Sequence, residues 1–432
     1  MTSDLKERRD RASSLKKQGN VDEALKMYQS LWVETKDKWD GWNLVQCMNK
    51  NKQYNDAYDI SREVYKQDPD FDYLKGPYAF AGYMVKIKDY KPEDDYGEIF
   101  KPAIGVMELT EKKKDDLARQ LTVLKMLEIC EKQSRWEDLI EWSGKIDSDV
   151  LSTGSFKTQV RGKNVSLPSN RVKWFLKVTK AYEKLEQWDK CYEISCEAIR
   201  QFPDDVWFKR RKAISVGYNG ELDQAISDLI NISLTKSDWF IFRDIAMMYI
   251  KKDDYKKALE YLIEGCLVSV NIPDPGYRWE LYYYAALCFQ KNNEEDLSKK
   301  HLLLSFSLRD NEGWKTPEVL SDLASELGVE LDPIEDTKKY MKELKSYWTK
   351  QKFSSLPKNI GTIKTILPNG KAGFITSDDG EDYYFKVFSY NGNRKGLVRG
   401  MKVEFYKQES FDRVKNKKSF QAVNISNINK KA

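Results

Sequence analysis

Residues 242–265 read FRDIAMMYIKKDDYKKALEYLIEG, and this stretch decides the fold of most of the chain. Apolar side chains recur at three- and four-residue spacing on both sides of the sequence KKDD, which is typical of two amphipathic helices joined by a short turn. Tyr255 follows the turn, and the small residue Ala258 comes three positions later. A small side chain there lets two helix axes approach closely. The stretch therefore predicts a helical hairpin.

The same pattern recurs along the chain. Seven copies place a small or apolar residue where this stretch has its alanine, at Ala24, Ala57, Leu139, Cys191, Ala225, Ala258 and Leu297. Several neighbouring copies are 33 or 34 residues apart. With this repeat length, the segment from about residue 5 to 310 resembles the tetratricopeptide repeat. The resemblance implies an α-solenoid of stacked helical hairpins, with a concave groove that in the family usually holds a peptide or a protein surface.

Two parts of the predicted array depart from the regular spacing. The long interval between Ala57 and Leu139 predicts one further, atypical helical pair at about residues 73–86 and 96–110. Residues 152–171 contain Gly-Ser, Arg-Gly and Pro-Ser-Asn sequences, so they are predicted to form a long loop inside the array.

Residues 311–354 carry two amphipathic segments after the last repeat. In the second of them Met341, Leu344 and Trp348 fall on one stripe at helical spacing. Because the last repeat of a stacked array would otherwise expose its apolar face, these segments are predicted to be capping helices. The predicted divisions are therefore residues 1–310 for the repeat array and 311–354 for the capping helices and a linker.

Residues 355–432 follow a different pattern. Short runs of β-branched and aromatic residues alternate with Gly, Asn and Asp turns, which predicts five strands at residues 361–364, 372–375, 382–388, 401–406 and 421–425. Five strands in so short a segment favour a small closed barrel over an open sheet. The fold class is therefore mainly α, with a five-stranded antiparallel β-barrel at the C-terminal end.

The order of these strands resembles a cold-shock domain, an OB-type barrel that binds single-stranded RNA or DNA. The residues that carry the resemblance are Gly361-Thr362-Ile363-Lys364, Gly373-Phe374-Ile375, Asp382-Tyr383-Tyr384-Phe385-Lys386 and Gln421-Ala422-Val423-Asn424-Ile425. The resemblance implies that four residues contact nucleic acid on one face of the barrel: Lys364, Phe374, Tyr384 and Lys386. The aromatic side chains would stack on bases and the lysines would contact phosphates.

The segment also departs from the family pattern. Thr365 stands where the family usually has Trp, Ala372 where it has an aromatic, and Lys386 where it has His. Since stacking on an aromatic ring is worth about 1–3 kcal/mol per base, the loss of these groups predicts weaker binding in which phosphate contacts matter more. It also keeps open a barrel that has become a protein-binding module.

Positive charge is concentrated in the predicted barrel. Residues 355–432 contain 15 Lys and Arg against 7 Asp and Glu, a net charge of +8, whereas residues 1–354 contain 58 against 61, a net charge of −3. Such asymmetry indicates a polyanionic partner. Four basic residues are predicted to lie in the loop before the last strand and to contact phosphates: Arg413, Lys415, Lys417 and Lys418. Taken alone, this cluster is interpreted as an exposed, solvated hairpin loop, and the phosphate contact is predicted for it as part of a cold-shock-like barrel.

Patterns that would indicate catalysis are missing from the sequence. His301 is the only histidine, the six cysteines form no CxxC pair, and no GxxxxGK[ST] or GxGxxG motif occurs. The acidic residues 378–382 could attract Mg²⁺, but their place between two predicted strands favours a polar turn. The basic run 209–212 is interpreted as a solvated helix face, with a nucleic-acid path as the alternative. No catalytic residue, metal site or cofactor is therefore predicted.

The sequence thus predicts a non-catalytic RNA-binding adaptor. Its barrel would hold single-stranded RNA or DNA while the repeat groove docks an unidentified protein or peptide. Two alternatives stay open: a protein-interaction scaffold whose barrel has lost nucleic-acid binding, and an accessory or regulatory subunit of a nucleic-acid-processing or defence enzyme. Charged residues 4–11 argue against a signal peptide, and apolar runs such as 285–289 are too short to span a bilayer, so we expect a cytoplasmic protein without membrane contact.

Overall fold

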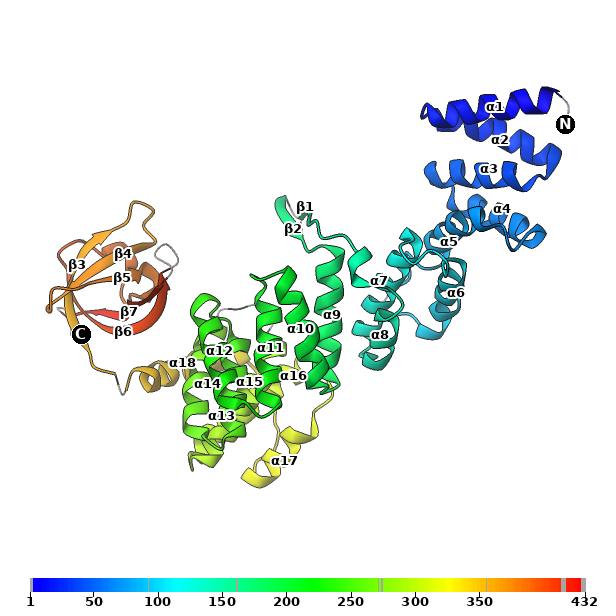
Figure 1. Ribbon diagram of the computed structural model, residues 1–432. Coiled ribbons are helices and arrows are strands. Elements are labelled where there is room, and N and C mark those ends of the chain that lie inside the picture. The colour runs from blue at the N-terminus through cyan, green and yellow to red at the C-terminus, as the bar shows by residue number, and fades with distance from the viewer. Residues whose placement is uncertain are drawn as a thin grey trace. The chain divides into compact units, whose positions relative to one another are not determined.

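The computed structural model of the chain describes residues 3–91, 93–160, 162–270, 272, 275–354, 356–412 and 417–428 (Figure 1). The chain divides into two compact units, Met1–Arg211 and Lys212–Ala432. Helix α11, Val206–Tyr218, contains the division. Among the described residues, none of the helices has both the length and the apolar character needed to cross a membrane.

The first unit consists of antiparallel helical pairs in which each helix packs on the next along the chain (Figure 1). Its helices are α1 Ser3–Lys17, α2 Val21–Thr35, α3 Lys38–Lys50, α4 Tyr54–Gln67, α5 Asp72–Lys86, α6 Tyr96–Leu109, α7 Leu117–Lys132, α8 Trp136–Ser143, α9 Asn170–Lys184 and α10 Trp188–Gln201. A 3-10 turn, η1, spans Ser148–Val150. Helices α5 and α6 are the atypical pair predicted between the regular repeats.

The recurring small residue closes each pair. Ala24, Ala57, Leu139 and Cys191 are each the fourth residue of the second helix of a pair, and all four are fully buried. Ile99 holds the same place in α6 and is also fully buried. A longer polar side chain at these places would separate the two helices, so the observed burial explains the period in the sequence.

The second unit continues the helical pairs. Its helices are α12 Leu222–Thr235, α13 Trp239–Lys251, α14 Tyr255–Ser269, α15 Trp279–Lys291, α16 Glu295–Asp310, α17 Glu318–Leu327 and α18 Thr337–Phe353, with a 3-10 turn, η2, at Pro275–Arg278. Ala225 and Ala258 are fully buried as predicted. The alignment at Leu297 was wrong by one residue, because Ser298 is the fully buried fourth residue of α16. Its hydroxyl donates a 2.8 Å hydrogen bond to the Ala286 carbonyl, which satisfies the polar group inside the pair.

Helix α18 covers the last pairs with the predicted stripe of Met341, Leu344 and Trp348, which is buried against α14, α15 and α16. The Trp348 indole N–H donates a 2.9 Å hydrogen bond to Nε2 of His301. The other ring nitrogen, Nδ1, lies 2.7 Å from the Leu297 carbonyl. Burial lowers the pKa of His301 to about 4, so the imidazole is neutral at physiological pH and serves as a packed hydrogen-bonding group.

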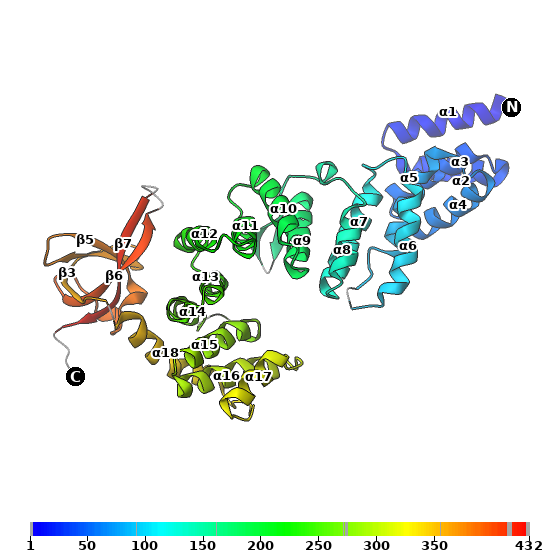
Figure 2. The ribbon, with the colours of Figure 1, turned by 60° about the horizontal axis from the view of Figure 1, so that its bottom comes forward.

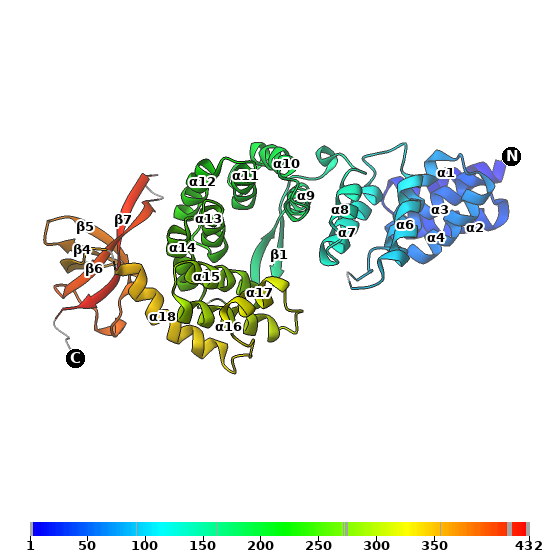
Figure 3. The same ribbon diagram turned by 90° about the horizontal axis from the view of Figure 1, so that it is seen from below.

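The predicted long loop at residues 152–171 was wrong, because it contains a β-hairpin (Figure 3). Strand β1, Phe156–Val160, pairs antiparallel with β2, Lys163–Leu167. Gly162 provides the turn with a φ of 75°, which glycine adopts without steric cost. Thr158 pairs with Val165 across the hairpin, and such β-branched residues favour extended backbone.

The C-terminal part of the second unit is a closed barrel with the strand order β3-β4-β5-β7-β6. The strands are β3 Asn359–Ile366, β4 Ala372–Ser377, β5 Asp382–Lys386, β6 Lys402–Asp412 and β7 Lys417–Asn427. Its interior contains Ile363, Ile375, Phe385, Phe405 and Ile425, all fully buried. The prediction of a mainly α fold followed by a small five-stranded barrel is confirmed.

Three details of the barrel differ from the prediction. The pair β5–β7 is parallel, so the barrel is mixed rather than wholly antiparallel. The third strand ends at Lys386 because the chain turns into a 3-10 segment, η3, at Val387–Ser389. Strand β7 begins at Lys417 rather than near Gln421, because its pairing with β6 continues past the barrel as a long hairpin.

Candidate functional site

The outer face of β4 and β5 carries the predicted stacking residues. Phe374 and Tyr384 pair directly across these two strands, and their rings lie edge to face with centroids 5.8 Å apart. Tyr384 is 37% exposed and Phe374 is partly buried. Thr365 continues the row on β3 and Gln421 on β7. The structure thus brings the two predicted aromatic residues together on one surface that spans four strands.

Lys364 lies on the same side but is held in an ion pair. Its ammonium group contacts the Asp382 carboxylate, and the Thr376 hydroxyl donates a 2.6 Å hydrogen bond to the other oxygen of that carboxylate. The hydrogen bond from Lys364, followed by that from Thr376, lowers the pKa of Asp382 below its usual range. Lys364 would therefore have to exchange this partner for a phosphate, so its net contribution to binding is small.

Lys386 lies beside a third aromatic ring that the sequence reasoning missed. Its ammonium group is 5.6 Å from the ring centroid of Phe388, which is 64% exposed. Phe388 lies in η3 and not in β5, so strand alternation does not place it, and its position beside Lys386 appears only in the folded chain. An exposed ring beside a lysine can stack on a base while the ammonium group contacts the adjoining phosphate.

The predicted basic cluster is only partly described. Arg413 and Lys415 lie outside the described residues. Lys417 and Lys418 are exposed but lie in β7, where they pair with Asp412 and Phe411 of β6, so their assignment to the loop before the strand was wrong. Successive residues of a strand point to opposite faces, and the two lysines therefore present their charges on opposite sides of the hairpin.

The acidic turn between β4 and β5 is occupied by its own neighbours. Asp379 accepts a hydrogen bond from the Ser377 hydroxyl and lies 3.2 Å from the Lys407 ammonium group. The Tyr383 hydroxyl donates a 2.5 Å hydrogen bond to Glu381. In the part of the chain that the structure describes, no group of three or more His, Cys, Asp or Glu side chains is placed to hold a metal ion.

The basic run 209–212 is not a solvated face, because Arg210 and Arg211 are buried. Their guanidinium groups lie 3.1 Å and 2.9 Å from the carboxylate of Glu183 on α9. Burial would raise the pKa of Glu183, but the two guanidinium charges outweigh it and lower this pKa to about 2. The interpretation of the run as solvated was wrong for these two arginines, which join α9 to α11.

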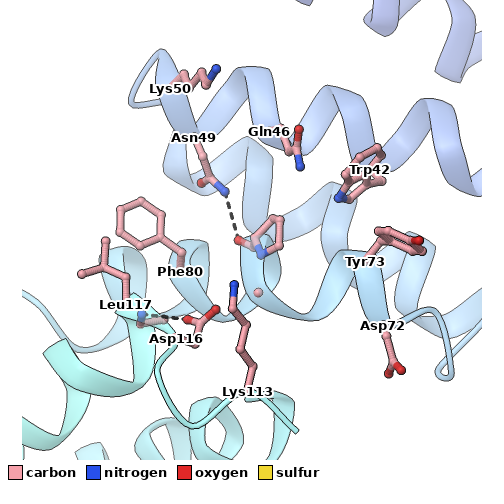
Figure 4. Close-up of a pocket in the computed structure, with 13 residues that line it drawn as sticks. Trp42, Gln46, Asn49, Lys50, Asp72, Tyr73, Phe80, Lys113, Asp116 and Leu117 are labelled. Atoms are coloured by element: carbon pink, nitrogen blue, oxygen red, sulfur yellow. Dashed lines mark hydrogen bonds between the residues drawn. The ribbon is translucent and has the colours of Figure 1, made fainter. Parts of the chain in front are cut away.

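A cavity of about 720 Å³ lies in the first unit between α3, α5 and α7, the first helices of three successive pairs (Figure 4). It is lined by Trp42, Gln46, Asn49 and Lys50 of α3, by Asp72, Tyr73, Gly76, Pro77 and Phe80 of α5, by Lys113 and Asp116 in the turn before α7, and by Leu117 and Ala118 at the start of α7. The lining is mixed, because the rings of Trp42, Tyr73 and Phe80 share it with the charged side chains of Lys113 and Asp116 (Figure 4).

Two buried polar atoms at this cavity lack hydrogen-bond partners among the described residues, the indole N–H of Trp42 and the side-chain oxygen of Asn49. The amide nitrogen of Asn49 donates a 3.0 Å hydrogen bond to the Pro77 carbonyl (Figure 4). Tyr73, 62% exposed, packs 5.7 Å from Trp42 and 5.0 Å from Trp39, centroid to centroid. The lining thus contains an exposed ring beside Trp42 and two buried polar atoms without described partners.

No protein-family model matches the chain, and no curated protein matches it. Solved structures with a similar arrangement include a tetratricopeptide repeat protein from Parabacteroides merdae, with 9% identity, coverage of 75% of this chain and 98% of that chain, and a TM-score of 0.32. A monomeric mutant of IFIT1 with m7Gppp-AAAA has 13% identity, coverage of 73% of this chain and 70% of that chain, and a TM-score of 0.36. The TPR2AB domain of yeast Sti1 in a complex with pHSP90 has 14% identity, coverage of 67% of this chain and 99% of that chain, and a TM-score of 0.26.

These identities and TM-scores say nothing of what the chain binds. The repeat architecture rests on the chain's own helical pairs and on the buried residue that closes each of them.

Proposed function

We propose that the chain is a non-catalytic adaptor that binds single-stranded RNA or DNA on the β4–β5 face of its barrel and docks a protein segment in the cavity between α3, α5 and α7. The observation that carries this proposal is the pair of the exposed Tyr384 and the partly buried Phe374, with Phe388 and Lys386 beside it. Three rings and a lysine on one surface form a stacking platform for successive bases.

The barrel does not need these rings for its core. Its interior is filled by other side chains, such as Ile363, Phe385 and Phe405, which are fully buried. Exposed aromatic surface carries a solvation cost, and on a domain with a net charge of +8 it is well explained by a ligand that supplies bases and phosphates. Duplex nucleic acid keeps its bases stacked internally, so the platform favours single strands.

The cavity of the first unit supports the protein-docking part of the proposal. The indole N–H of Trp42 and the side-chain oxygen of Asn49 are buried without a partner among the described residues, so a segment that displaces the neighbouring side chains would gain a donor and an acceptor. Tyr73 offers an exposed ring for an apolar side chain of the same segment. A peptide would supply these groups together.

The absence of catalysis is part of the proposal. Both ring nitrogens of His301 are engaged, one by Trp348 and the other by the Leu297 carbonyl, so this residue is a poor general base. The carboxylates of Asp379 and Asp382 are engaged by lysines and hydroxyl groups of the barrel.

Binding of labelled oligonucleotides to the full-length protein tests the proposal. We expect a single strand to bind more tightly than a duplex of the same length. The Phe374→Ala/Tyr384→Ala variant should lose most of that binding while its melting temperature stays within a few degrees of wild type. If the wild type binds neither form, the barrel is a protein-interaction module and the scaffold alternative stands. If it binds both forms equally, the stacking platform is refuted.

A further inference from the structure

A second cavity lies in the second unit between α18 and strands β6 and β7 of the barrel. Figures 2 and 3 show α18 beside β6. The cavity has a volume of about 850 Å³. It is lined by Lys342, Lys345, Ser346, Thr349, Lys350, Phe353, Ser354, Leu356, Lys358, Asn391, Tyr406 and Asn424. We call it the α18 groove. Its lining contains lysine and neutral polar side chains but no carboxylate.

Helix α18 supplies most of the positive charge. Its buried stripe packs on the preceding helices, whereas Lys342, Lys345 and Lys350 are exposed toward the groove. None of the three forms an ion pair with a described residue. Three like charges on one helix repel one another, so this arrangement is unfavourable until an anion binds. The fourth lysine, Lys358, is already neutralised by Glu404, whose carboxylate lies 3.0 Å away.

The floor of the groove joins α18 to the barrel through two stacked rings. Phe353 and Tyr406 have centroids 4.6 Å apart and an interplanar angle of 28°. Beside them the amide of Asn391 donates a 2.5 Å hydrogen bond to the side-chain oxygen of Asn424. Asn424 has a φ of 49°, in the left-handed region, and is held there inside β7. The groove therefore presents amide groups at a position that the barrel itself fixes.

We infer that the α18 groove is a second contact site for the same single-stranded nucleic acid, a conclusion that rests on the proposed function of the barrel. The lysines of α18 would contact phosphates, and the two asparagines would hydrogen-bond to bases or sugars. An acidic peptide would also satisfy the lysines, and its backbone could pair with the asparagines. Nucleic acid is favoured because β7 carries both Gln421, in the row of the aromatic platform, and Asn424, in the groove, so that one strand can continue from the first site to the second.

The strand order determines how one ligand could reach both sites. Phe374 and Tyr384 lie on β4 and β5, whereas Tyr406 and Asn424 lie on β6 and β7, and β7 is the neighbour of β5. A strand that leaves the aromatic platform across β7 would continue toward the groove. Short oligonucleotides would therefore occupy the platform alone, and longer ones would contact both sites.

The test uses the full-length protein and two single-stranded oligonucleotides, of about 6 and about 20 nucleotides, chosen around the usual site size of one OB-type barrel. The variant Lys342→Gln/Lys345→Gln/Lys350→Gln removes the charge of α18 that faces the groove. A matched control, Lys300→Gln/Lys338→Gln/Lys339→Gln, removes the same net charge from exposed lysines of the second unit that do not line the groove.

We expect the groove variant to bind the short oligonucleotide like wild type. For the long one its log–log salt slope should fall by about 2, since each phosphate contact contributes about 0.7. Between about 50 and about 200 mM salt, wild type would then lose about 15-fold more affinity than the variant. The control should follow wild type for both ligands.

Two results would overturn the inference: an unchanged slope for the long oligonucleotide, or an equal effect of the control and groove variants. If the groove variant instead loses binding of a poly-glutamate peptide and keeps the long oligonucleotide, the groove is a peptide site. Failure of the barrel proposal gives a different pattern, in which Phe374→Ala/Tyr384→Ala leaves both oligonucleotides bound as in wild type.

Discussion

Replacing Tyr384 with alanine separates a binding role from a packing role. The ring is 37% exposed and lies outside the barrel's buried cluster, so its removal leaves no interior cavity. What the folded protein loses is the edge-to-face contact with Phe374, worth about 0.5–1.5 kcal/mol. What the complex loses is one stacking platform, worth about 1–3 kcal/mol. We therefore expect an affinity about 5- to 150-fold weaker and only a small fall in melting temperature.

Two further variants calibrate this measurement. Tyr384→Phe keeps the ring and should bind within a few-fold of wild type. Phe385→Ala, at the next position of β5, removes a fully buried ring. Large-to-small changes of this kind cost about 3–5 kcal/mol of stability, so this variant should melt much earlier than wild type.

Fluorescence anisotropy with a labelled single strand gives the affinity, and a thermal melt of each sample gives the stability. The reasoning is refuted if Tyr384→Ala binds like wild type. It is also refuted if this variant destabilises the protein as much as Phe385→Ala does, because the ring would then belong to the core.

Three further predictions test other parts of the molecule. Lys417→Gln/Lys418→Gln should lower the log–log salt slope for single strands by about 0.7 for all sequences alike, because the two lysines face opposite sides of the hairpin and one strand contacts only one of them. A sequence-dependent loss without a slope change would contradict phosphate contact. Glu183→Gln should destabilise the first unit by about 3 kcal/mol at pH 7, because its carboxylate pairs with two buried guanidinium groups. The folded-state pKa of Glu183 is depressed from 4.5 to about 2, so its stabilisation is present above about pH 4.5 and is lost as the pH falls through 2. Urea unfolding across this range should show the difference from wild type shrinking, and a constant difference would contradict the assignment. Peptides selected on the wild type from a displayed library should bind Tyr73→Ala at least about fivefold more weakly, and unchanged binding would place the docking surface elsewhere.

The sequence predicted the helical pairs well, because one position in each pair is fully buried and is occupied by a small or apolar side chain in most copies. Ala24, Ala57 and Ala258 are fully buried where the 33- and 34-residue spacing placed them. The alignment at Leu297 failed because the array can also bury a small polar residue there, Ser298, provided that its hydroxyl finds a carbonyl.

Other features depend on partners far away in the chain and could not be read from local pattern. The basic run 209–212 has the sequence pattern of a solvated helix face. Two of its four side chains, Arg210 and Arg211, are nevertheless buried, because they pair with Glu183 on another helix. The ion pair of Lys364 with Asp382 likewise appears only when β3 and β5 are folded beside β4. The hairpin at residues 156–167 was missed because its turn residues were taken for a loop.

The parallel pairing of β5 with β7 has a consequence for how the barrel opens. It is the shortest pairing of the described barrel, limited to Tyr384 with Gln421 and Phe385 with Ala422, with an isolated bridge from Tyr390 to Ile425 beyond it. Joining segments distant in the chain carries a loop-closure entropy that a hairpin of neighbouring strands avoids, and here only two residue pairs offset it, against four between the equally distant β3 and β6. We therefore expect this seam to form last during folding and its amide protons to exchange with solvent sooner than those of β4. A nucleic acid strand laid across Phe374, Tyr384 and Gln421 would bridge the seam, and its binding would slow that exchange.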